Sequence, residues 1–235
     1  DGSVSFGPSP EGVQGKLSGG KLVASKGDDS ITLSRIERQS PTVGAKPPQG
    51  AFVLFDGTDA KHWKKGKVVD GLLASTGTTS IPTFNDCSIH LEFRTPYKPH
   101  ARGQGRGNSG VYYMGRWETQ VLDSFGLNGE MNECGGIYSI AKSRINMCLP
   151  PLTWQTYDVD YTGAKFDKDG KRTAWPRISV KLNGVLIHEN QELNKPHTTA
   201  APVSGAMKDE GGPIFLQAHG NAVFYRNIWV LPKKG

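Results

Sequence analysis

The chain has 235 residues with 30 glycines and 15 prolines, and 36% of its residues are hydrophobic. This composition favours many tight turns in one large all-β domain with a small appendage. The formal net charge is +6, but Lys and Arg are scattered along the chain, which argues against a basic face that binds nucleic acid. No stretch approaches the roughly 18 consecutive apolar residues that a membrane span requires.

The first part of the chain differs in pattern from the rest. Two alternating segments flank Ser18-Gly19-Gly20, which predicts a β-hairpin. A stretch at 40–48 contains three prolines and predicts an extended connector. We therefore expect residues 1–49 to form a small β extension with its linker, and residues 50–235 to form the main domain. The chain begins without methionine, as expected of a processed or trimmed protein.

The clearest alternation in the sequence runs from Ser88 to Thr95 and predicts a strand with one apolar face. The opposite face carries His90, Glu92 and Arg94. A solvated surface is one interpretation of this face. Three titratable or charged groups in a row exceed what solubility requires, so Glu92 and Arg94 are candidate binding residues.

A glycine-rich segment at 102–110 precedes the next predicted strand, 111–114. It lacks the Lys-Ser/Thr ending and the following helix of a phosphate-binding loop. We interpret it as a loop at the rim of a site, with Asn108 at its end.

The segment Trp117–Asp123 carries two acids and an amide in a strand-like pattern. Glu118 and Gln120 share one face, about 6.6 Å apart along the strand, while Trp117 takes the other face. A β-bulge before Asp123 would bring its carboxyl group to the face of Glu118. Two carboxyl groups beside an amide suit acid/base chemistry on a sugar, and a solvent-facing polar stripe is the alternative.

The three cysteines give information on the cellular compartment of the protein. Cys87 is isolated and predicted to be a small buried hydrophobe, while Cys134 and Cys148 match no zinc-ligand spacing. A disulfide between these two would close a loop of about 15 residues, worth about 3 kcal/mol. We predict this disulfide and, with it, a secreted or periplasmic location.

The C-terminal half continues the all-β pattern. The segment 154–161 alternates, and Asn183-Gly184 predicts a tight hairpin. The segment 214–220 places Gln217 and His219 on one face, as candidate site residues. A core histidine satisfied by a neighbouring strand is the alternative for His219.

Eight short motifs occur in a fixed order along the main domain. They are Leu54-Phe55-Asp56-Gly57, Glu92-Phe93-Arg94, Asn108-Ser109-Gly110-Val111, Glu118-Thr119-Gln120-Val121-Leu122-Asp123, Trp154-Gln155-Thr156-Tyr157-Asp158, Leu182-Asn183-Gly184-Val185, Leu216-Gln217-Ala218-His219-Gly220 and Tyr225-Arg226-Asn227-Ile228. Together they resemble the bacterial 3-keto-disaccharide hydrolase domain family, formerly a domain of unknown function, over about residues 50–232. Tyr225 stands where Phe is usual.

The resemblance implies an all-β, concanavalin-like jelly-roll sandwich of two antiparallel sheets, with a concave face that holds a glycan. The spacing Glu118-x-Gln120-x-x-Asp123 is also similar to the carboxylate signature of laminarinase-type glucanases. In those enzymes the central residue is an acid, whereas here it is an amide. A two-carboxylate retaining mechanism is therefore in doubt.

The resemblance further implies cleavage of a glycoside whose sugar has first been oxidised at C3. A base removes the acidified C2 proton, the C1 aglycone leaves, and water adds to the resulting enone. His219 and Glu118 are the candidate base and acid, with Asp123 as a further catalytic candidate, and the sequence leaves open which of the three is the base. Arg94 is the candidate group that stabilises the enolate oxygen. The remaining candidates would bind the sugar or orient these groups; they are Glu92, Asn108, Trp117, Gln120 and Gln217.

Two other functions remain open. The first is hydrolysis of an unoxidised glucan by Glu118 and Asp123 as a pair. The second is a non-catalytic carbohydrate-binding module that depends on exposed aromatics such as Trp63, Trp117 or Trp175. No cofactor is certain; a divalent metal could replace Arg94 as the electrophile. The expected partners are a carbohydrate substrate and a glycoside 3-oxidoreductase that produces the 3-keto sugar.

Overall fold

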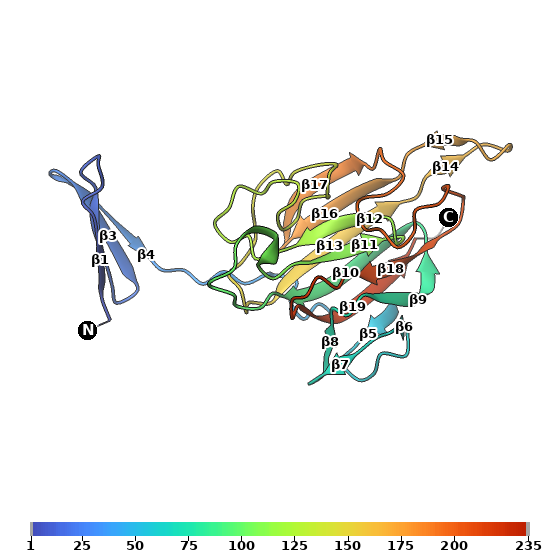
Figure 1. Cartoon of the computed structure of the whole chain (residues 1–235), viewed down its shortest axis with the longest axis horizontal. Helices are drawn as coiled ribbons and strands as arrows, with labels where there is room; N and C mark the ends of the chain where they lie inside the picture. The colour runs from blue at the N-terminus through green and yellow to red at the C-terminus, as the bar shows by residue number, and fades with distance from the viewer. Residues whose placement is uncertain (1, 234–235) are drawn as a thin grey trace. The chain divides into compact units, whose positions relative to one another are not determined.

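The computed structural model describes residues 2–233, which are almost entirely strands, turns and loops (Figure 1). The chain forms two compact units, Asp1–Arg38 and Gln39–Gly235. The segment 39–49, which the sequence assigns to the N-terminal linker, thus belongs to the larger unit. Within the described part of the chain, no helix has the length and apolar character needed to cross a bilayer.

The smaller unit is one antiparallel sheet with its strands in chain order. The strands are β1 (Val4–Phe6), β2 (Gln14–Ser18), β3 (Lys21–Lys26) and β4 (Asp29–Ser34). The predicted hairpin joins β2 to β3, and its two glycines both have positive φ, at 54° and 72°. Glycine adopts this backbone conformation without steric cost.

The larger unit contains two main antiparallel sheets. The eight-stranded sheet has the order β17-β16-β13-β10-β19-β8-β7, with β5 also paired to β19, and the five-stranded sheet has the order β12-β11-β18-β9-β6. A short β14–β15 hairpin stands apart from both sheets. The elements are β5 (Phe52–Phe55), β6 (Trp63–Lys64), β7 (Val68–Val69), β8 (Leu72–Ala74), β9 (Thr78–Phe84), β10 (Cys87–Arg94), the 3-10 turn η1 (Gly103–Gly105), β11 (Ser109–Tyr113), β12 (Trp117–Val121), β13 (Gln155–Thr162), β14 (Lys165–Phe166), β15 (Arg172–Ala174), β16 (Arg177–Leu182), β17 (Val185–Glu192), β18 (Gly212–Leu216) and β19 (Phe224–Pro232).

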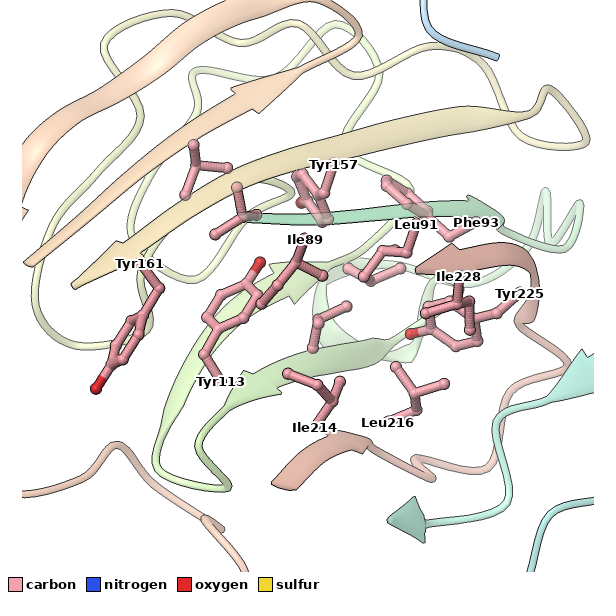
Figure 2. Close-up of a cluster of buried hydrophobic side chains, with 14 of the residues drawn as sticks. Ile89, Leu91, Phe93, Tyr113, Tyr157, Tyr161, Ile214, Leu216, Tyr225 and Ile228 are labelled. Atoms are coloured by element: carbon pink, nitrogen blue, oxygen red, sulfur yellow. The ribbon is translucent and has the colours of Figure 1, made fainter. Parts of the chain in front are cut away.

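The hydrophobic core lies between the two sheets. The predicted inward residues of β10, namely Ile89, Leu91 and Phe93, are buried there, as are Tyr113 of the facing sheet and Tyr157 of β13 (Figure 2). This alternation follows from the period of two along a strand. The larger unit is therefore the antiparallel β-sandwich that the sequence analysis predicts.

The connector after the N-terminal unit lies against the outer face of the eight-stranded sheet. Ser40 Oγ is 2.6 Å from Thr156 Oγ1, and Thr42 Oγ1 donates a 2.7 Å hydrogen bond to Asp158 Oδ2. The backbone N–H of Gly44 donates to Glu92 Oε1 at 2.6 Å. These bonds satisfy polar groups of β10 and β13 that would otherwise face solvent, so residues 40–44 of the connector are docked on the sheet.

The predicted disulfide is absent, because Cys134 and Cys148 are buried free thiols in the structure. Cys134 Sγ lies 3.4 Å from Tyr157 Oη, and Cys148 Sγ donates to the carbonyl oxygens of Leu122 and Leu149, at 3.6 Å and 3.4 Å. Each thiol thus has polar neighbours in the core without a covalent crosslink. The exported location inferred from the disulfide stays a prediction. The remaining cysteine, Cys87, is fully buried as predicted.

Candidate active site

The residues that the sequence singles out fall on two different faces of the sandwich. Glu118 and Gln120 project from the outer face of the five-stranded sheet, because their neighbour Trp117 points into the core. Glu92 and Arg94 project from the outer face of the eight-stranded sheet, on the other side of the core. The structure therefore does not bring these two pairs together. A single sugar cannot contact both.

Glu118 is the centre of the first group. Its side chain is buried, and Oε2 accepts a 2.8 Å hydrogen bond from Tyr112 Oη on the neighbouring strand. Its backbone N–H donates to Thr198 Oγ1 at 3.0 Å. The carboxyl group lies directly over Gly110 of β11, so closely that any Cβ at that position would collide with it. The glycine is therefore required for this placement of the carboxylate.

The environment of Glu118 changes its acidity. Burial disfavours the charged form and raises the pKa of Glu118 to about 7, although the hydrogen bond from Tyr112 opposes the rise. A carboxyl group with this pKa exchanges a proton readily at neutral pH. Glu118 thus has the property required of a general base or acid.

The Gln120 amide adjoins the Glu118 carboxylate, and the Gln104 amide adjoins that of Gln120. The Gln120 amide contacts Gln104 Oε1 at 2.7 Å. The opposite orientation of the Gln120 amide lets its nitrogen donate to Glu118 Oε1 at 3.1 Å and to the carbonyl oxygen of Ser109 at 2.7 Å. Gln104 Oε1 also accepts from Asn108 Nδ2 at 2.9 Å. The glycine-rich loop therefore inserts Gln104 among the site residues rather than only forming a rim.

Three buried oxygen acceptors in this region have no hydrogen-bond donor among the described residues. They are Asn108 Oδ1, Asp123 Oδ1 and Gln217 Oε1. An unpaired buried acceptor is costly, and the hydroxyl groups of a sugar are donors that would satisfy it. All three residues are candidates that the sequence analysis assigns to sugar contacts or catalysis.

Asp123 follows the end of β12. The pairing of β12 with β11 runs from Trp117 to Val121 without a register shift, so the expected bulge does not occur within the strand. Asp123 Oδ2 accepts a 2.7 Å hydrogen bond from Arg106 Nε, and its backbone N–H donates to the carbonyl oxygen of Arg106. Arg106 and Asp123 thus form an ion pair beside the end of β12.

Gln217 and His219 follow β18 in sequence. Gln217 Nε2 donates to Tyr112 Oη at 3.0 Å, which links Gln217 to Glu118 through the phenol. His219 is exposed, so the alternative of a buried core histidine is wrong. Among residues 2–233, no hydrogen bond joins the His219 side chain to Glu118, and no cluster of three or more His, Cys, Asp or Glu could hold a metal ion.

Sequence reasoning assigned Trp117 to the site, but this side chain is buried between the sheets, 6.0 Å from the Tyr161 ring. It therefore has no exposed ring for a sugar. Conversely, reasoning from the sequence missed Tyr112 and Gln104. Alternation would have found Tyr112, which points away from the core residues beside it and stands opposite Glu118 in the β11–β12 pairing.

The second group forms a buried network below the connector. Glu92 accepts hydrogen bonds from Arg226 Nε at 2.7 Å and Asn227 Nδ2 at 2.9 Å, and His90 Nδ1 lies 2.6 Å from Asp158 Oδ1. Burial alone would raise the pKa of Glu92, but the neighbouring His90, 3.8 Å away, and the hydrogen bonds from Asn227, Gly44 and Arg226 prevail and lower the pKa to about 2. Both oxygens of the Glu92 carboxylate accept hydrogen bonds from protein groups, which fits a structural role.

Residues 50–231 match the model of a family described as a 3-keto-alpha-glucoside-1,2-lyase-like domain. A candidate glycosyl hydrolase of Parabacteroides distasonis ATCC 8503, solved at 2.13 Å, is 31% identical with a TM-score of 0.71; the match covers 79% of this chain and 85% of that one. A second one from this organism, solved at 1.70 Å, is 19% identical with a TM-score of 0.59, covers 79% and 95%, and shows the fold alone. No curated protein matches the chain.

Proposed function

Because the chain belongs to the 3-keto-alpha-glucoside-1,2-lyase-like family, we propose that it cleaves glycosides oxidised at C3, by elimination followed by hydration. The observation that carries this proposal is the Glu118 carboxyl group, which is buried on the outer face of the five-stranded sheet with its pKa raised to about 7. Elimination needs a base that is partly ionised at neutral pH and shielded from water.

In the proposed reaction, Glu118 removes the proton from C2, which the adjacent 3-keto group makes acidic. The electron pair first forms an enolate and then expels the C1 aglycone, which leaves a 2-hydroxy-3-keto-glycal with a C1–C2 double bond. Water then adds at C1, while a proton returns to C2. The net change is hydrolysis, with no change in oxidation state.

The neighbouring residues take supporting roles in this proposal. Tyr112 holds the Glu118 carboxyl group by its 2.8 Å hydrogen bond, and Gln217 in turn donates to Tyr112. Asn108, Asp123 and Gln217 each have a buried oxygen atom without a donor, and these side chains would turn towards the bound sugar to accept hydrogen bonds from its hydroxyl groups. His219, exposed just beyond Gln217, is assigned the proton that the departing aglycone takes up.

The proposed substrate has implications for partners and location. A 3-keto sugar arises by oxidation of a secondary hydroxyl group, so we propose that a glycoside 3-oxidoreductase supplies the substrate. We also propose a secreted or periplasmic location in a bacterium, where glycans are encountered first.

The proposal is tested by measuring aglycone release from a 3-keto-β-glucoside, its α-anomer and the corresponding plain glucosides. Wild type, Glu118→Gln and His219→Ala are compared, each with and without chelator. We expect turnover of a keto substrate only, a loss of at least a hundredfold in Glu118→Gln, and exchange of the C2 proton with solvent deuterium. Turnover of a plain glucoside would indicate a conventional hydrolase. Glycan binding without turnover of any substrate would indicate a binding module.

A further inference from the structure

A cationic cluster lies on the outer face of the eight-stranded sheet, where the connector ends. Arg94 Cζ lies 4.9 Å from the centre of the Trp154 ring, and Arg226 Cζ lies 4.0 Å from the same centre. All three side chains are half-buried. Arg226 pairs with Glu92 and Arg94 pairs with Phe224, so the two arginines are diagonal neighbours on the paired strands β10 and β19, near enough for one small ligand to contact both guanidinium groups.

The hydrogen-bond donors of this cluster are largely unused by the protein. Arg226 donates through Nε to Glu92, and no other side-chain bond of Arg226 is found within residues 2–233. Arg94 forms no ion pair with any described residue. An arginine stacked on an aromatic ring keeps its N–H groups pointing outward, where they can bind a planar anion.

The acidic groups nearby do not neutralise Arg94. Glu92 is fully buried, and its two oxygens are occupied by Arg226, Asn227 and the backbone N–H of Gly44. Asp158 bonds to His90 and Thr42. The charge of Arg94 therefore remains uncompensated at the protein surface.

Apolar surface adjoins the cluster. Phe224 stands directly opposite Arg94 in the β10–β19 pairing. It projects outward because the next residue, Tyr225, points into the core, and Phe224 is partly exposed. Guanidinium groups beside aromatic rings suit a ligand that combines an anion with the C–H face of a sugar ring.

We propose that Arg94, Arg226, Trp154 and Phe224 form a second carbohydrate site, which binds the carboxylate of a uronic acid residue. Arg94 and the free terminal nitrogens of Arg226 bind the carboxylate, and Phe224 contacts the sugar ring. The site is separate from Glu118, since the hydrophobic core lies between the two outer faces. It would hold an acidic glycan without cleaving it.

The test is isothermal titration calorimetry of the full chain at low ionic strength. Trigalacturonic acid is the ligand, maltotriose is the neutral ligand of equal length, and inorganic sulfate is the simple anion. We expect binding of trigalacturonic acid at least tenfold tighter than that of maltotriose and of sulfate. Arg94→Gln should lose at least tenfold of this affinity, whereas Glu118→Gln should keep it.

A matched control is available in the β14–β15 hairpin, where Arg172 Cζ lies 3.4 Å from the centre of the Trp175 ring. Arg172→Gln removes a stacked arginine elsewhere and should leave the affinity unchanged. Thermal melting checks that each variant is folded. Arg94→Lys keeps the positive charge but loses the paired N–H groups of the guanidinium, so it should bind with intermediate affinity. Equal binding of sulfate, equal loss in Arg172→Gln, or no binding of trigalacturonic acid would overturn the proposal.

Discussion

Tyr112 and Glu118 stand opposite each other on paired strands, and the phenol donates a 2.8 Å hydrogen bond to the carboxylate. Because this bond stabilises the charged form, it lowers the pKa of Glu118 against the effect of burial. Burial and the Tyr112 hydrogen bond thus shift the pKa of Glu118 in opposite directions. The pKa of Glu118 therefore depends on Tyr112, which the register of the β11–β12 pair places opposite it.

Tyr112→Phe should therefore raise the pKa of Glu118 above about 7. If Glu118 acts as the base, the acidic limb of the profile of kcat/KM against pH moves to higher pH, and the rate at pH 6 falls several-fold. The measurement is a pH–rate profile with a 3-keto-glucoside. Tyr113→Phe is the control, because Tyr113 points into the core. A lower rate with an unmoved limb would show that Tyr112 does not act through the pKa of Glu118.

Glu118 also makes the stability of the fold depend on pH. Its folded pKa of about 7 exceeds the ordinary value of 4.5, so the contribution of Glu118 to stability is fully present below pH 4.5 and is lost as the pH rises from 4.5 to about 7. Glu118→Gln should raise the free energy of unfolding by roughly 3 kcal/mol at pH 8 and change it little at pH 4. Denaturant unfolding at the two pH values measures the difference. An equal effect of the substitution at both would contradict the raised pKa.

Gly110→Ala tests the closeness of Glu118 to β11. The new methyl group would collide with the carboxylate, which must then leave its hydrogen bond with Tyr112. We expect activity to fall at least a hundredfold while the protein remains folded, as judged by circular dichroism. Gly105→Ala is the control, because no atom of residues 2–233 beyond its chain neighbours lies within 4 Å of its Cβ position. Full activity of Gly110→Ala would show that the carboxylate need not occupy this position.

The family and the fold can be predicted from the sequence because both depend on patterns among residues that are close together in the chain. Alternation along 88–95 identifies Ile89, Leu91 and Phe93 as core, and the ordered motifs identify the family, both of which are confirmed. Alternation also places Glu118 and Gln120 together. It specifies only that a side chain faces outward, however, and every sandwich has two outward faces. Glu92 therefore seemed compatible with Glu118, although β10 and β12 belong to different sheets.

Other differences between the predicted and the observed structure arise from contacts between residues that are distant in sequence. Gly44 lies 48 positions from Glu92, and no local pattern predicts that its N–H bonds to the carboxylate. The buried thiols of Cys134 and Cys148 illustrate the same limit, since the spacing of two cysteines does not determine whether they are bonded. The place of Gln104 in the site could not be predicted, because the glycines around it indicate only a loop.

Glu92 should contribute to stability with the opposite pH dependence to Glu118. Its folded pKa of about 2 lies below the ordinary 4.5, so its stabilising effect is present above pH 4.5 and is lost as the pH falls towards 2. Glu92→Gln should cost roughly 2–4 kcal/mol at pH 7 and progressively less on acidification. Urea unfolding between pH 3 and pH 7 measures this cost. A cost that stays constant over this range would contradict the ionic role of Glu92.

Two truncations distinguish the N-terminal unit from the docked connector. Removing residues 1–38 deletes a unit that is compact by itself and should leave the unfolding free energy of the larger unit unchanged. Removing residues 1–45 also deletes the Gly44 N–H that bonds to Glu92 and the Ala45 carbonyl oxygen that accepts from Asn227 Nδ2 at 3.0 Å. Because these losses leave buried polar groups unpaired, the longer truncation should cost roughly 2–5 kcal/mol more than the shorter one. Equal stability of the two truncated chains in urea would show that the connector contributes nothing to the sandwich.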